Sequence, residues 1–422
     1  MHSHTMKLLK RRMSLLSFAL ICLAVGSFAA SAQSSQSATD PYLVRARRIL
    51  RQTPLIDGHN DLPWRIREDS IARGRVDAYD LRKHTPGHTD IERLKKGMVG
   101  AQFWSVYTPG EYADSGYARV QLEQIDIAKR VIEKYPDLLA LALSADDIRR
   151  DFKRGKIGSL LGLEGGHAIE NSLGALRAYY DLGVRYMTLT HNVTLAWADA
   201  ALDSAKHNGL TPFGDSVVRE MNRLGMLVDL SHVSPATMSD ALNVTQSPVI
   251  FSHSGARALV DVPRNVPDSI LRRVTANGGI VMVPFVTGFV SPAVQLYEQS
   301  TRPLITDLRA KYGNDTAAIT REVNQWRVTH PAPRATLAQV ADQIDHVRKV
   351  AGVDHVGIGS DFDGITEVVQ GLEDVSTFPA LFAELARRGW SDSDLRKLAG
   401  ENLLRVFSQA EAVAKRLQRT PR

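Results

Sequence analysis

The chain has 422 residues, of which 44% are hydrophobic and 23% are charged. That composition is typical of a soluble globular protein with enough apolar material for one large domain or two ordinary ones. The formal net charge is +6, but residues 1–32 hold four basic side chains and no acidic one, so the remainder carries only +2. So small a charge argues against a polyanionic partner, and we expect no nucleic acid among the partners.

The first 32 residues have the pattern of a secretory signal peptide. A basic stretch, KLLKRR, precedes the apolar stretch LLSFALICLAVGSFAA, and Ala30-Ser31-Ala32 offers a small-residue cleavage site. The apolar stretch is short for a membrane span, so an uncleaved anchor is the weaker interpretation. We expect an exported protein, periplasmic or secreted, with no stable membrane anchor after signal cleavage. Arg11-Arg12 leaves both Sec and twin-arginine export open.

Cys22 is the only cysteine, and it lies inside the predicted signal peptide. The mature chain is therefore expected to have neither a disulfide bond nor a thiolate metal ligand. Any metal site must be built from histidine and carboxylate side chains. The C-terminal sequence AKRLQRTPR is polar and basic, which argues against a lipid-anchor signal at that end.

After a polar leader at residues 33–41, short apolar runs alternate with longer segments of helical periodicity. The runs span residues 53–59, 97–107, 157–165, 184–191, 225–232, 247–253, 278–285 and 355–363. Between them lie helix-like segments such as YARVQLEQIDIAKRVIEKY, SLGALRAYYDLG and FGDSVVREMNRLG, the last two ending in glycine. Eight buried strands joined by helices predict an α/β fold, a (β/α)8 TIM-like barrel, formed by residues 42–422 as one domain.

The segment from Thr287 to about Val350 is long for one connection between a strand and the next. It contains four prolines, at positions 292, 303, 331 and 333. We predict an inserted lid or helical subdomain before the last strand. The side-chain preference of the site would then depend partly on walls that this insertion supplies.

Polar residues stand at the ends of most apolar runs. In chain order they are His59 and Asp61, Glu164, His191, His232, His253, and Asp361 with Asp363. In an eight-stranded barrel the carboxyl ends of the strands converge on one rim, where such barrels have their active sites. Zinc binds imidazole and carboxylate groups readily. His59 and Asp61 suit one ion, and His232 and His253 suit a second. Glu164 is placed to bridge the two ions.

A histidine at one strand end is by itself a weak indication of a metal site, since many such residues only form hydrogen bonds. Here four runs end in histidine and another in glutamate, which favours a joint metal site. The other histidines of the mature chain lack this placement. We expect structural or surface roles for His84, His88, His167, His207, His330, His346 and His355.

Seven segments, in order from residue 56 to residue 364, resemble motifs of the membrane (renal-type) dipeptidase family. They are IDGHNDLPW, LGLEGGHAI, MTLTHN with the following WAD, VDLSHVS, FSHSGARAL, RNVPD and GIGSDFDG. The resemblance implies a (β/α)8 barrel that carries two Zn2+ ions and hydrolyses dipeptides as a non-covalent homodimer. It also implies that dipeptides with a C-terminal D-residue are accepted and, for some members, that β-lactam rings are opened. The implied metal ligands are His59, Asp61, Glu164, His232 and His253.

The resemblance implies three further residues that act on the substrate. His191 matches a substrate-binding histidine, Arg264 an arginine that receives the C-terminal carboxylate, and Asp361 an acid near the scissile bond and amino group. A guanidinium binds a carboxylate through two hydrogen bonds, and a carboxylate binds an ammonium. The metal-bridging hydroxide would attack the carbonyl, while zinc and His191 stabilise the oxyanion. Asp361 would pass a proton to the leaving amine or only anchor the substrate's amine.

Two other functions stay open at this point. One is another two-metal amidohydrolase on the same barrel, acting on lactams, lactones, other amides or phosphoesters. Many such barrels have His-x-His on the first strand and a modified lysine as bridge, whereas this chain has His59-x-Asp61 and Glu164. The other is a non-catalytic binding protein that keeps the fold. A binding role alone would not need all five candidate ligands, so we predict a dipeptidase.

Overall fold

The computed structural model describes residues 40–110, 116–313 and 315–419. The predicted signal peptide and most of the predicted leader lie outside these residues. Asp40 and Pro41, which the sequence analysis placed at the end of the leader, are the N-cap and first residue of helix α2 (Pro41–Leu50). The Asp40 carboxylate accepts a hydrogen bond from the Tyr42 N–H and so stabilises the start of this helix. Within the described ranges, no helix has both the length and the apolar character that crossing a membrane requires.

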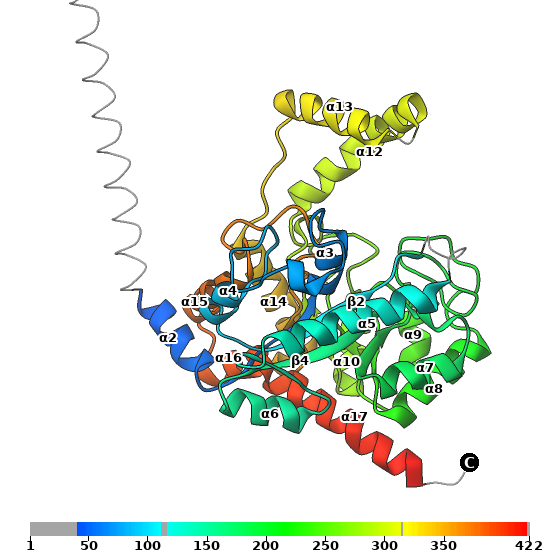
Figure 1. Cartoon of the computed structure of the whole chain (residues 1–422), viewed down its shortest axis with the longest axis vertical. Helices are drawn as coiled ribbons and strands as arrows, with labels where there is room; N and C mark the ends of the chain where they lie inside the picture. Colours follow the sequence, from blue (N-terminus) through cyan, green and yellow to red (C-terminus); the bar gives the residue numbers. More distant parts are fainter. Residues whose placement is uncertain (1–39, 111–115, 314, 420–422) are drawn as a thin grey trace, which may run out of the picture.

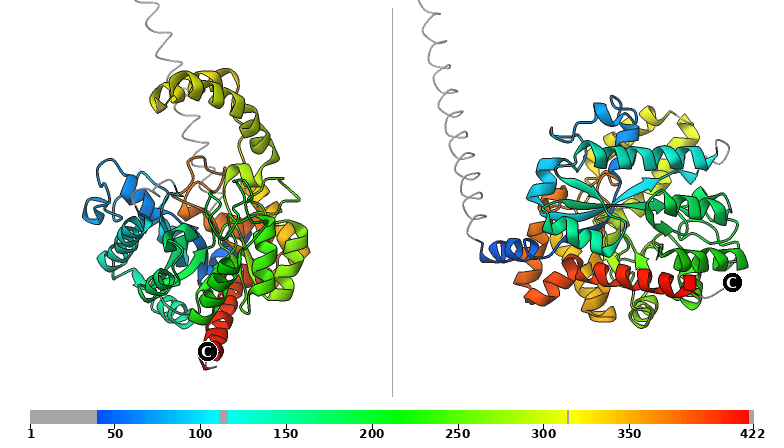
Figure 2. Two further views of the ribbon diagram at one scale, coloured as in Figure 1. Left: turned by 90° about the vertical axis from the view of Figure 1, so that its right-hand side faces the viewer. Right: turned by 60° about the horizontal axis from the view of Figure 1, so that its bottom comes forward.

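Eight parallel strands close into a barrel (Figure 2). They are β1 (Leu55–Asn60), β2 (Val99–Tyr107), β4 (Ile157–Glu164), β5 (Val184–Thr188), β6 (Leu227–Asp229), β7 (Ile250–Phe251), β8 (Ile280–Val283) and β9 (Val356–Ile358). β1 pairs with both β2 and β9, and β2 pairs with β4, which closes the ring. These strands lie in the eight apolar runs, so the predicted (β/α)8 barrel is confirmed.

One further strand, β3 (Leu139–Leu141), was not predicted. It pairs with the first residues of β4, and β5 pairs with the later residues on the same edge of β4. Three residues are too few to show a strand pattern in the sequence, and no polar site residue marks the end of this one.

Helices surround the strands (Figure 1). Apart from α2 and the insertion, they are α3 (Leu62–Glu68), α4 (Ile91–Lys96), α5 (Tyr117–Lys134), α6 (Ala145–Lys153), α7 (Leu173–Asp181), α8 (Pro212–Leu224), α9 (Pro235–Val244), α10 (Asp268–Asn277), α14 (Leu337–Ala351), α15 (Phe378–Arg387), α16 (Asp392–Arg396) and α17 (Asn402–Arg419). Short 3-10 turns lie at Val76–Ala78, Gly166–Ile169, Val353–His355 and Val375–Thr377, and a π-helical turn lies at Lys397–Glu401. The three helix-like segments of the sequence are α5, α7 and α8.

The barrel wall separates two parts of the core. Outside it, the strands pack against the surrounding helices. Inside it, Phe103, Leu160 and Tyr186 belong to a second cluster, which Leu403 and Phe407 of α17 join. That cluster also contains the first residues of several strands, so α17 covers the end of the barrel opposite the strand ends that carry the polar residues (Figure 1).

The predicted insertion is a helical hairpin. After the short helix α11 (Thr287–Val290), α12 (Pro292–Tyr312) and α13 (Thr316–Thr329) stand away from the barrel (Figure 1). The chain then returns to the barrel through α14. Ser291 Oγ accepts a hydrogen bond of 3.1 Å from Gln339 Nε2, which holds the two ends of the insertion together.

Candidate metal centre

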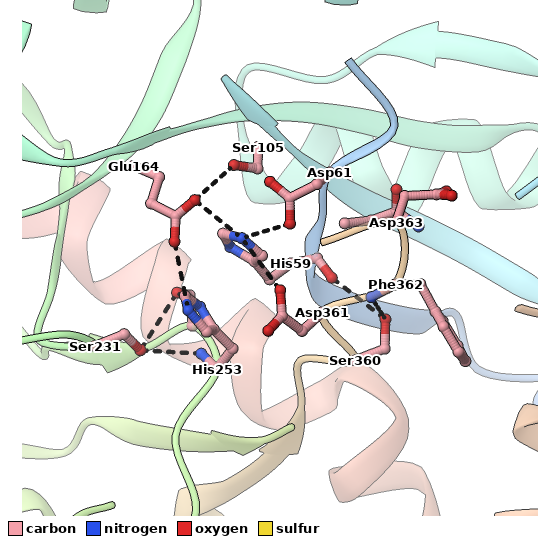
Figure 3. A network of polar contacts seen from close by, with 12 residues as sticks. His59, Asp61, Ser105, Glu164, Ser231, His253, Ser360, Asp361, Phe362 and Asp363 are labelled. Carbon is pink, nitrogen blue, oxygen red and sulfur yellow. Dashed lines mark hydrogen bonds and ion pairs between the residues drawn. The ribbon is translucent and has the colours of Figure 1, made fainter. Parts of the chain in front are cut away.

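The predicted site residues lie at the carboxyl ends of six barrel strands. Glu164 and His59 belong to β4 and β1, and the residues after β1, β5, β6, β7 and β9 include Asp61, His191, His232, His253 and Asp361. Because parallel barrel strands end at one rim, their side chains converge there (Figure 3). The structure therefore brings together residues that are up to 302 positions apart in the chain.

Glu164 connects the two sides of the cluster, with one carboxylate oxygen toward His59 and the other toward His253 (Figure 3). Its Oε2 is 3.5 Å from His59 Nε2, and Asp61 Oδ2 is 3.2 Å from the same nitrogen. Its Oε1 is 3.0 Å from His232 Nε2 and 3.5 Å from His253 Nε2. Each carboxylate oxygen therefore faces one of the two ligand pairs expected from the sequence, which is the geometry of a bridge.

Two of the histidine rings are turned toward Glu164 by hydrogen bonds on the opposite ring nitrogen. His232 Nδ1 is 3.0 Å from Asn192 Oδ1, and His253 Nδ1 is 2.8 Å from Ser252 Oγ. An amide oxygen only accepts, so His232 Nδ1 carries the proton and its Nε2 presents a lone pair. His232 Nε2 and His253 Nε2 approach each other to 2.8 Å. Two ring nitrogens that converge beside a carboxylate fit a divalent metal ion.

His59 is the third ring of the cluster. Its Nδ1 lies 2.8 Å from the Tyr186 hydroxyl, whereas its Nε2 is buried and has no hydrogen-bond partner among the described residues. An unsatisfied buried nitrogen is costly, but it fits a metal ligand when carboxylates stand beside it. The residues of this rim therefore fit the metal ions that the sequence predicts.

The ionisation of the cluster also suits metal binding. Burial lowers the pKa values of His232 and His253 well below the usual value for histidine, so both rings are neutral, the form that binds metals. Burial on its own would raise the pKa of Glu164. The neighbouring histidines, His59 above all, outweigh it and hold that pKa well below its usual range. The central carboxylate is therefore ionised.

Arg264 lines the same cavity as the cluster and is only 2% exposed. Among the described residues its guanidinium makes two long hydrogen bonds, to Ser254 Oγ at 3.4 Å and to the His253 carbonyl at 3.5 Å. It also lies over the Phe289 ring, 5.4 Å from the centroid. Burial lowers its pKa to about 10, which still leaves it charged at neutral pH. A buried cation with such weak partners is suited to bind an anion.

His191 and Asp361 lie on either side of the cluster. His191 Nε2 is 3.9 Å from Glu164 Oε1, and the ring packs against Tyr107 with a centroid distance of 4.8 Å. Asp361 Oδ1 is 3.9 Å from His59 Nε2. Asp361 adopts a left-handed conformation with φ of 67°, and its N–H donates to the His59 carbonyl at 3.0 Å. Strained backbone of this kind is frequent at functional sites.

A cavity of about 470 Å³ opens onto the cluster. Its apolar and aromatic walls come from Trp64, Tyr107, Leu202, Val286, Phe289 and Ile365. A cavity of this size, with apolar walls and a few convergent charged groups, is typical of a small-molecule site. A larger cavity of about 690 Å³, lined by residues such as Leu50, Met98 and Phe152, contains none of the predicted site residues.

Several residues that shape the site were missed by the sequence analysis. Asn192, Ser252 and Tyr186 contact the Nδ1 atoms of the three histidines described above. His88, for which a structural or surface role was expected, accepts a hydrogen bond of 2.9 Å at Nδ1 from the N–H of Asp363, two residues after Asp361. Two of these residues adjoin predicted site residues in the sequence, which is the only signal that pointed to them.

A sequence profile of the membrane dipeptidase family, peptidase family M19, matches residues 43–421. The chain belongs to the membrane dipeptidase family. The resemblance found in the sequence is thereby confirmed, and the protein is a metal-dependent dipeptidase, a hydrolase.

Solved structures of several proteins share this fold. The probable dipeptidase PvdM from Pseudomonas aeruginosa is 24% identical, with a TM-score of 0.76 over 88% of this chain and 99% of that one. A metallo peptidase from Rhodobacter sphaeroides, liganded with a phosphinate mimic of the dipeptide L-Ala-D-Ala, is 24% identical, with a TM-score of 0.69 over 85% and 99%. Dipeptidase AC, a metallo peptidase of family M19, is 25% identical, with a TM-score of 0.69 over 85% and 98%.

Proposed function

We propose that this dipeptidase uses two zinc ions to hydrolyse dipeptides, including those with a C-terminal D-residue. The observation that carries the proposal is the Glu164 carboxylate, whose two oxygens face separate ligand pairs. His59 and Asp61 would hold one ion, and His232 and His253 the other. When bound, two zinc ions supply Lewis acidity for the peptide carbonyl and activate water.

The chain's own residues would bind and orient the dipeptide. A dipeptide has a carboxylate at one end and an ammonium at the other, and the cavity holds a complementary group for each. Arg264 would bind the carboxylate and Asp361 the ammonium, or Asp361 would protonate the leaving amine. His191 would donate a hydrogen bond to the carbonyl oxygen as negative charge develops there. The Rhodobacter sphaeroides protein is liganded with a phosphinate mimic of the dipeptide L-Ala-D-Ala, which supports a substrate with a C-terminal D-residue.

We also propose that the protein is exported to the periplasm or secreted, and that it acts as a non-covalent homodimer. The signal-like pattern of residues 1–32 supports export. The family resemblance supports the dimer. Cell fractionation with N-terminal sequencing of the exported protein would test the first proposal, and light scattering of the purified protein would test the second.

Amino-acid release from L-Ala-D-Ala by the zinc-loaded protein tests the proposed reaction. We expect release from the free dipeptide only, and only with metal, with N-acetyl-L-Ala-D-Ala and a chelated enzyme as controls. Equal cleavage of the acetylated compound would contradict the proposed ammonium recognition. No release from this dipeptide or from a panel of L,L-dipeptides, with two zinc ions bound, would favour another amidohydrolase activity.

A further inference from the structure

Two aspartates next to the cluster, Asp57 on β1 and Asp229 on β6, are fully buried and are not among the proposed metal ligands. Each is paired with an isoleucine of a neighbouring strand, Ile358 of β9 for Asp57 and Ile250 of β7 for Asp229. Burying a carboxylate is costly unless hydrogen bonds compensate it. The hydrogen bonds on each aspartate therefore indicate what it stabilises.

Asp229 accepts four hydrogen bonds. The Ser252 N–H donates to Oδ1 at 2.8 Å, and the Ser252 hydroxyl donates to Oδ2 at 2.6 Å. The Ser231 N–H at 3.1 Å and the Thr188 hydroxyl at 2.6 Å supply the other two. The carboxylate thus holds the corner that follows β7 against the ends of β5 and β6.

Asp57 has the same arrangement at the corner that follows β9. The Ser360 N–H donates to Oδ1 at 2.7 Å, and the Ser360 hydroxyl donates to Oδ2 at 2.6 Å. The other two hydrogen bonds come from the His59 N–H at 3.4 Å and from Gln102 Nε2 at 3.0 Å. Each aspartate therefore binds both the N–H and the hydroxyl of the serine two residues beyond its paired isoleucine.

The two corners differ in the residue that follows the serine. Ser360 is followed by Asp361 (Figure 3). Ser252 is followed by His253, one of the proposed ligands. Ser252 Oγ also lies 2.8 Å from His253 Nδ1. The corner held by Asp229 thus reaches a histidine side chain directly, and the corner held by Asp57 offers no such contact.

The single hydroxyl proton of Ser252 determines the proton position on His253. The hydroxyl donates to Asp229, which as a carboxylate only accepts, so Ser252 Oγ must accept from His253 Nδ1–H. His253 Nε2 is then unprotonated and faces Glu164 Oε1 at 3.5 Å. A hydrogen bond of this kind on the far ring nitrogen fixes both the tautomer and the orientation of a metal ligand.

We propose that Asp229 and Ser252 are positioning residues, which form a carboxylate–serine–histidine relay that sets the zinc affinity of the His232–His253 pair. The inference rests on the proposed two-zinc function. Asp229 touches neither metal nor substrate in this arrangement and acts only through Ser252 and His253.

Ser252→Ala and Ser360→Ala form a matched pair for the test, since both serines are buried and both donate to an aspartate at 2.6 Å. Zinc affinities of the apoproteins would be measured by competition with a chelator. We expect Ser252→Ala to weaken one of the two zinc ions about 10- to 100-fold. Ser360→Ala should leave that ion as tightly bound as in the wild type. Urea unfolding should show a similar loss of stability for the two apoproteins, so that a difference in zinc affinity cannot come from a general loss of stability.

His232→Ala identifies which ion is affected, because it removes a ligand of that ion alone. In the His253→Ala background, which lacks the ring that Ser252 contacts, Ser252→Ala should cause no further loss of zinc affinity. A further loss there, or equal effects of Ser252→Ala and Ser360→Ala on the ion that depends on His232, would overturn the relay.

Asp229→Asn gives a second measurement that does not depend on Ser252→Ala folding. An amide nitrogen at this position donates to Ser252 Oγ, which turns the serine hydroxyl toward His253 Nδ1 and moves the ring proton to Nε2. We expect a loss of zinc affinity at least as large as with Ser252→Ala and a changed visible spectrum of the Co(II) form. An unchanged affinity and spectrum would overturn the relay. Binding of fewer than two zinc ions by the wild-type protein would overturn the proposed function as well. The zinc content of the wild type is therefore measured before any substitution is made.

Discussion

At the scale of single residues, the site combines buried charges with neutral rings. Glu164 is ionised although it is buried, because polar partners surround both of its oxygens. Arg264 keeps its charge with only weak partners of its own. Glu164 and Arg264 therefore each present a full charge to a ligand in the cavity. Substitution of each residue has a distinct expected effect.

Glu164→Gln tests the bridging role. The amide keeps the shape of the side chain but loses the charge that both ligand pairs face, so we expect fewer than two zinc ions per chain. Hydrolysis of L-Ala-D-Ala should fall by about a hundredfold or more. Elemental analysis and initial rates would measure both effects, with the exposed Glu92→Gln as control. Full zinc content with normal rates would show that Glu164 is not a ligand.

Arg264→Lys tests carboxylate recognition. An ammonium cannot make two parallel hydrogen bonds to a carboxylate, so we expect kcat/KM for L-Ala-D-Ala to fall about 10- to 100-fold, mainly through a higher KM. Steady-state kinetics with L-Ala-D-Ala and with its C-terminal amide would check this. The two enzymes should differ little on the amide, and an equal loss on both compounds would argue against this role.

At the scale of the elements, neighbouring strands approach closely beneath the site. The Tyr186 ring of β5 crosses the barrel interior next to Gly162 of β4, where an added Cβ would lie 2.0 Å from Tyr186 Cζ. The hydroxyl of the same ring contacts His59 Nδ1 at 2.8 Å. The absence of a side chain at one position of β4 thus allows a residue of β5 to support His59 of β1, a proposed metal ligand.

Gly162→Ala is expected to destabilise the protein and to weaken zinc binding. The added methyl group would force Tyr186 to move, at a cost of about 3 kcal/mol, and the ring would no longer hold His59 in place. Urea unfolding and zinc titration would measure the two effects. Gly174→Ala, whose Cβ would meet only Ser172 Oγ at 3.3 Å, should reduce neither the stability nor the zinc affinity. Equal stability of the two variants would contradict the packing argument.

Glu220 joins α7 and α8, since it accepts hydrogen bonds from Arg177 at 3.0 Å and from Arg223 at 2.6 Å. The hydrogen bond from Arg223 contributes most to lowering the pKa of Glu220 to about 2, and the one from Arg177 adds to it. Burial alone would raise this pKa. A depressed folded-state pKa adds stability that is complete above the unfolded value of 4.5 and is lost as the pH falls toward 2.

Glu220→Gln should therefore reduce the free energy of unfolding at pH 7 by about 1 kcal/mol, the effect being limited because both arginines are partly exposed. Urea unfolding of both proteins at pH 7 and pH 3 would measure the difference. We expect a smaller difference at pH 3, where part of the wild-type advantage is lost. An equal difference at both pH values would contradict the assignment.

At the scale of the whole molecule, the barrel and the hairpin of α12 and α13 are nearly separate structures (Figure 2). Only Val294, Thr301, Leu308 and Ala318 are buried within the two helices. Val286 and Phe289 line the site cavity, and both precede the hairpin in the chain.

Removal of residues 292–333, with a short glycine-serine linker in their place, should leave the barrel folded. Ser291 lies within hydrogen-bond distance of Gln339, five residues beyond the new junction at Arg334, so a linker of a few residues can join the ends. We expect a melting temperature within a few degrees of the wild type, two bound zinc ions and hydrolysis of L-Ala-D-Ala at a similar kcat. Loss of cooperative unfolding would show that the hairpin belongs to the barrel's folding unit.

The sequence by itself determined the barrel, the inserted helices and the residues that meet at the rim. Those features are local, since an apolar run followed by His59, Glu164 or His253 marks both a strand and the end of that strand. Parallel closure then brings every such end to the same place. The family motifs add the roles expected of these residues without any knowledge of their contacts.

Only the tertiary structure decided how the site residues are held. The partners of Asp229 come from β5, from the corner after its own strand β6 and from the corner after β7, and the ring that supports His59 comes from β5. These contacts depend on the register between strands that are far apart in the chain, which no local pattern records. The proton position on His253 follows from one serine hydroxyl and one carboxylate, and it became visible only when the strands were in place.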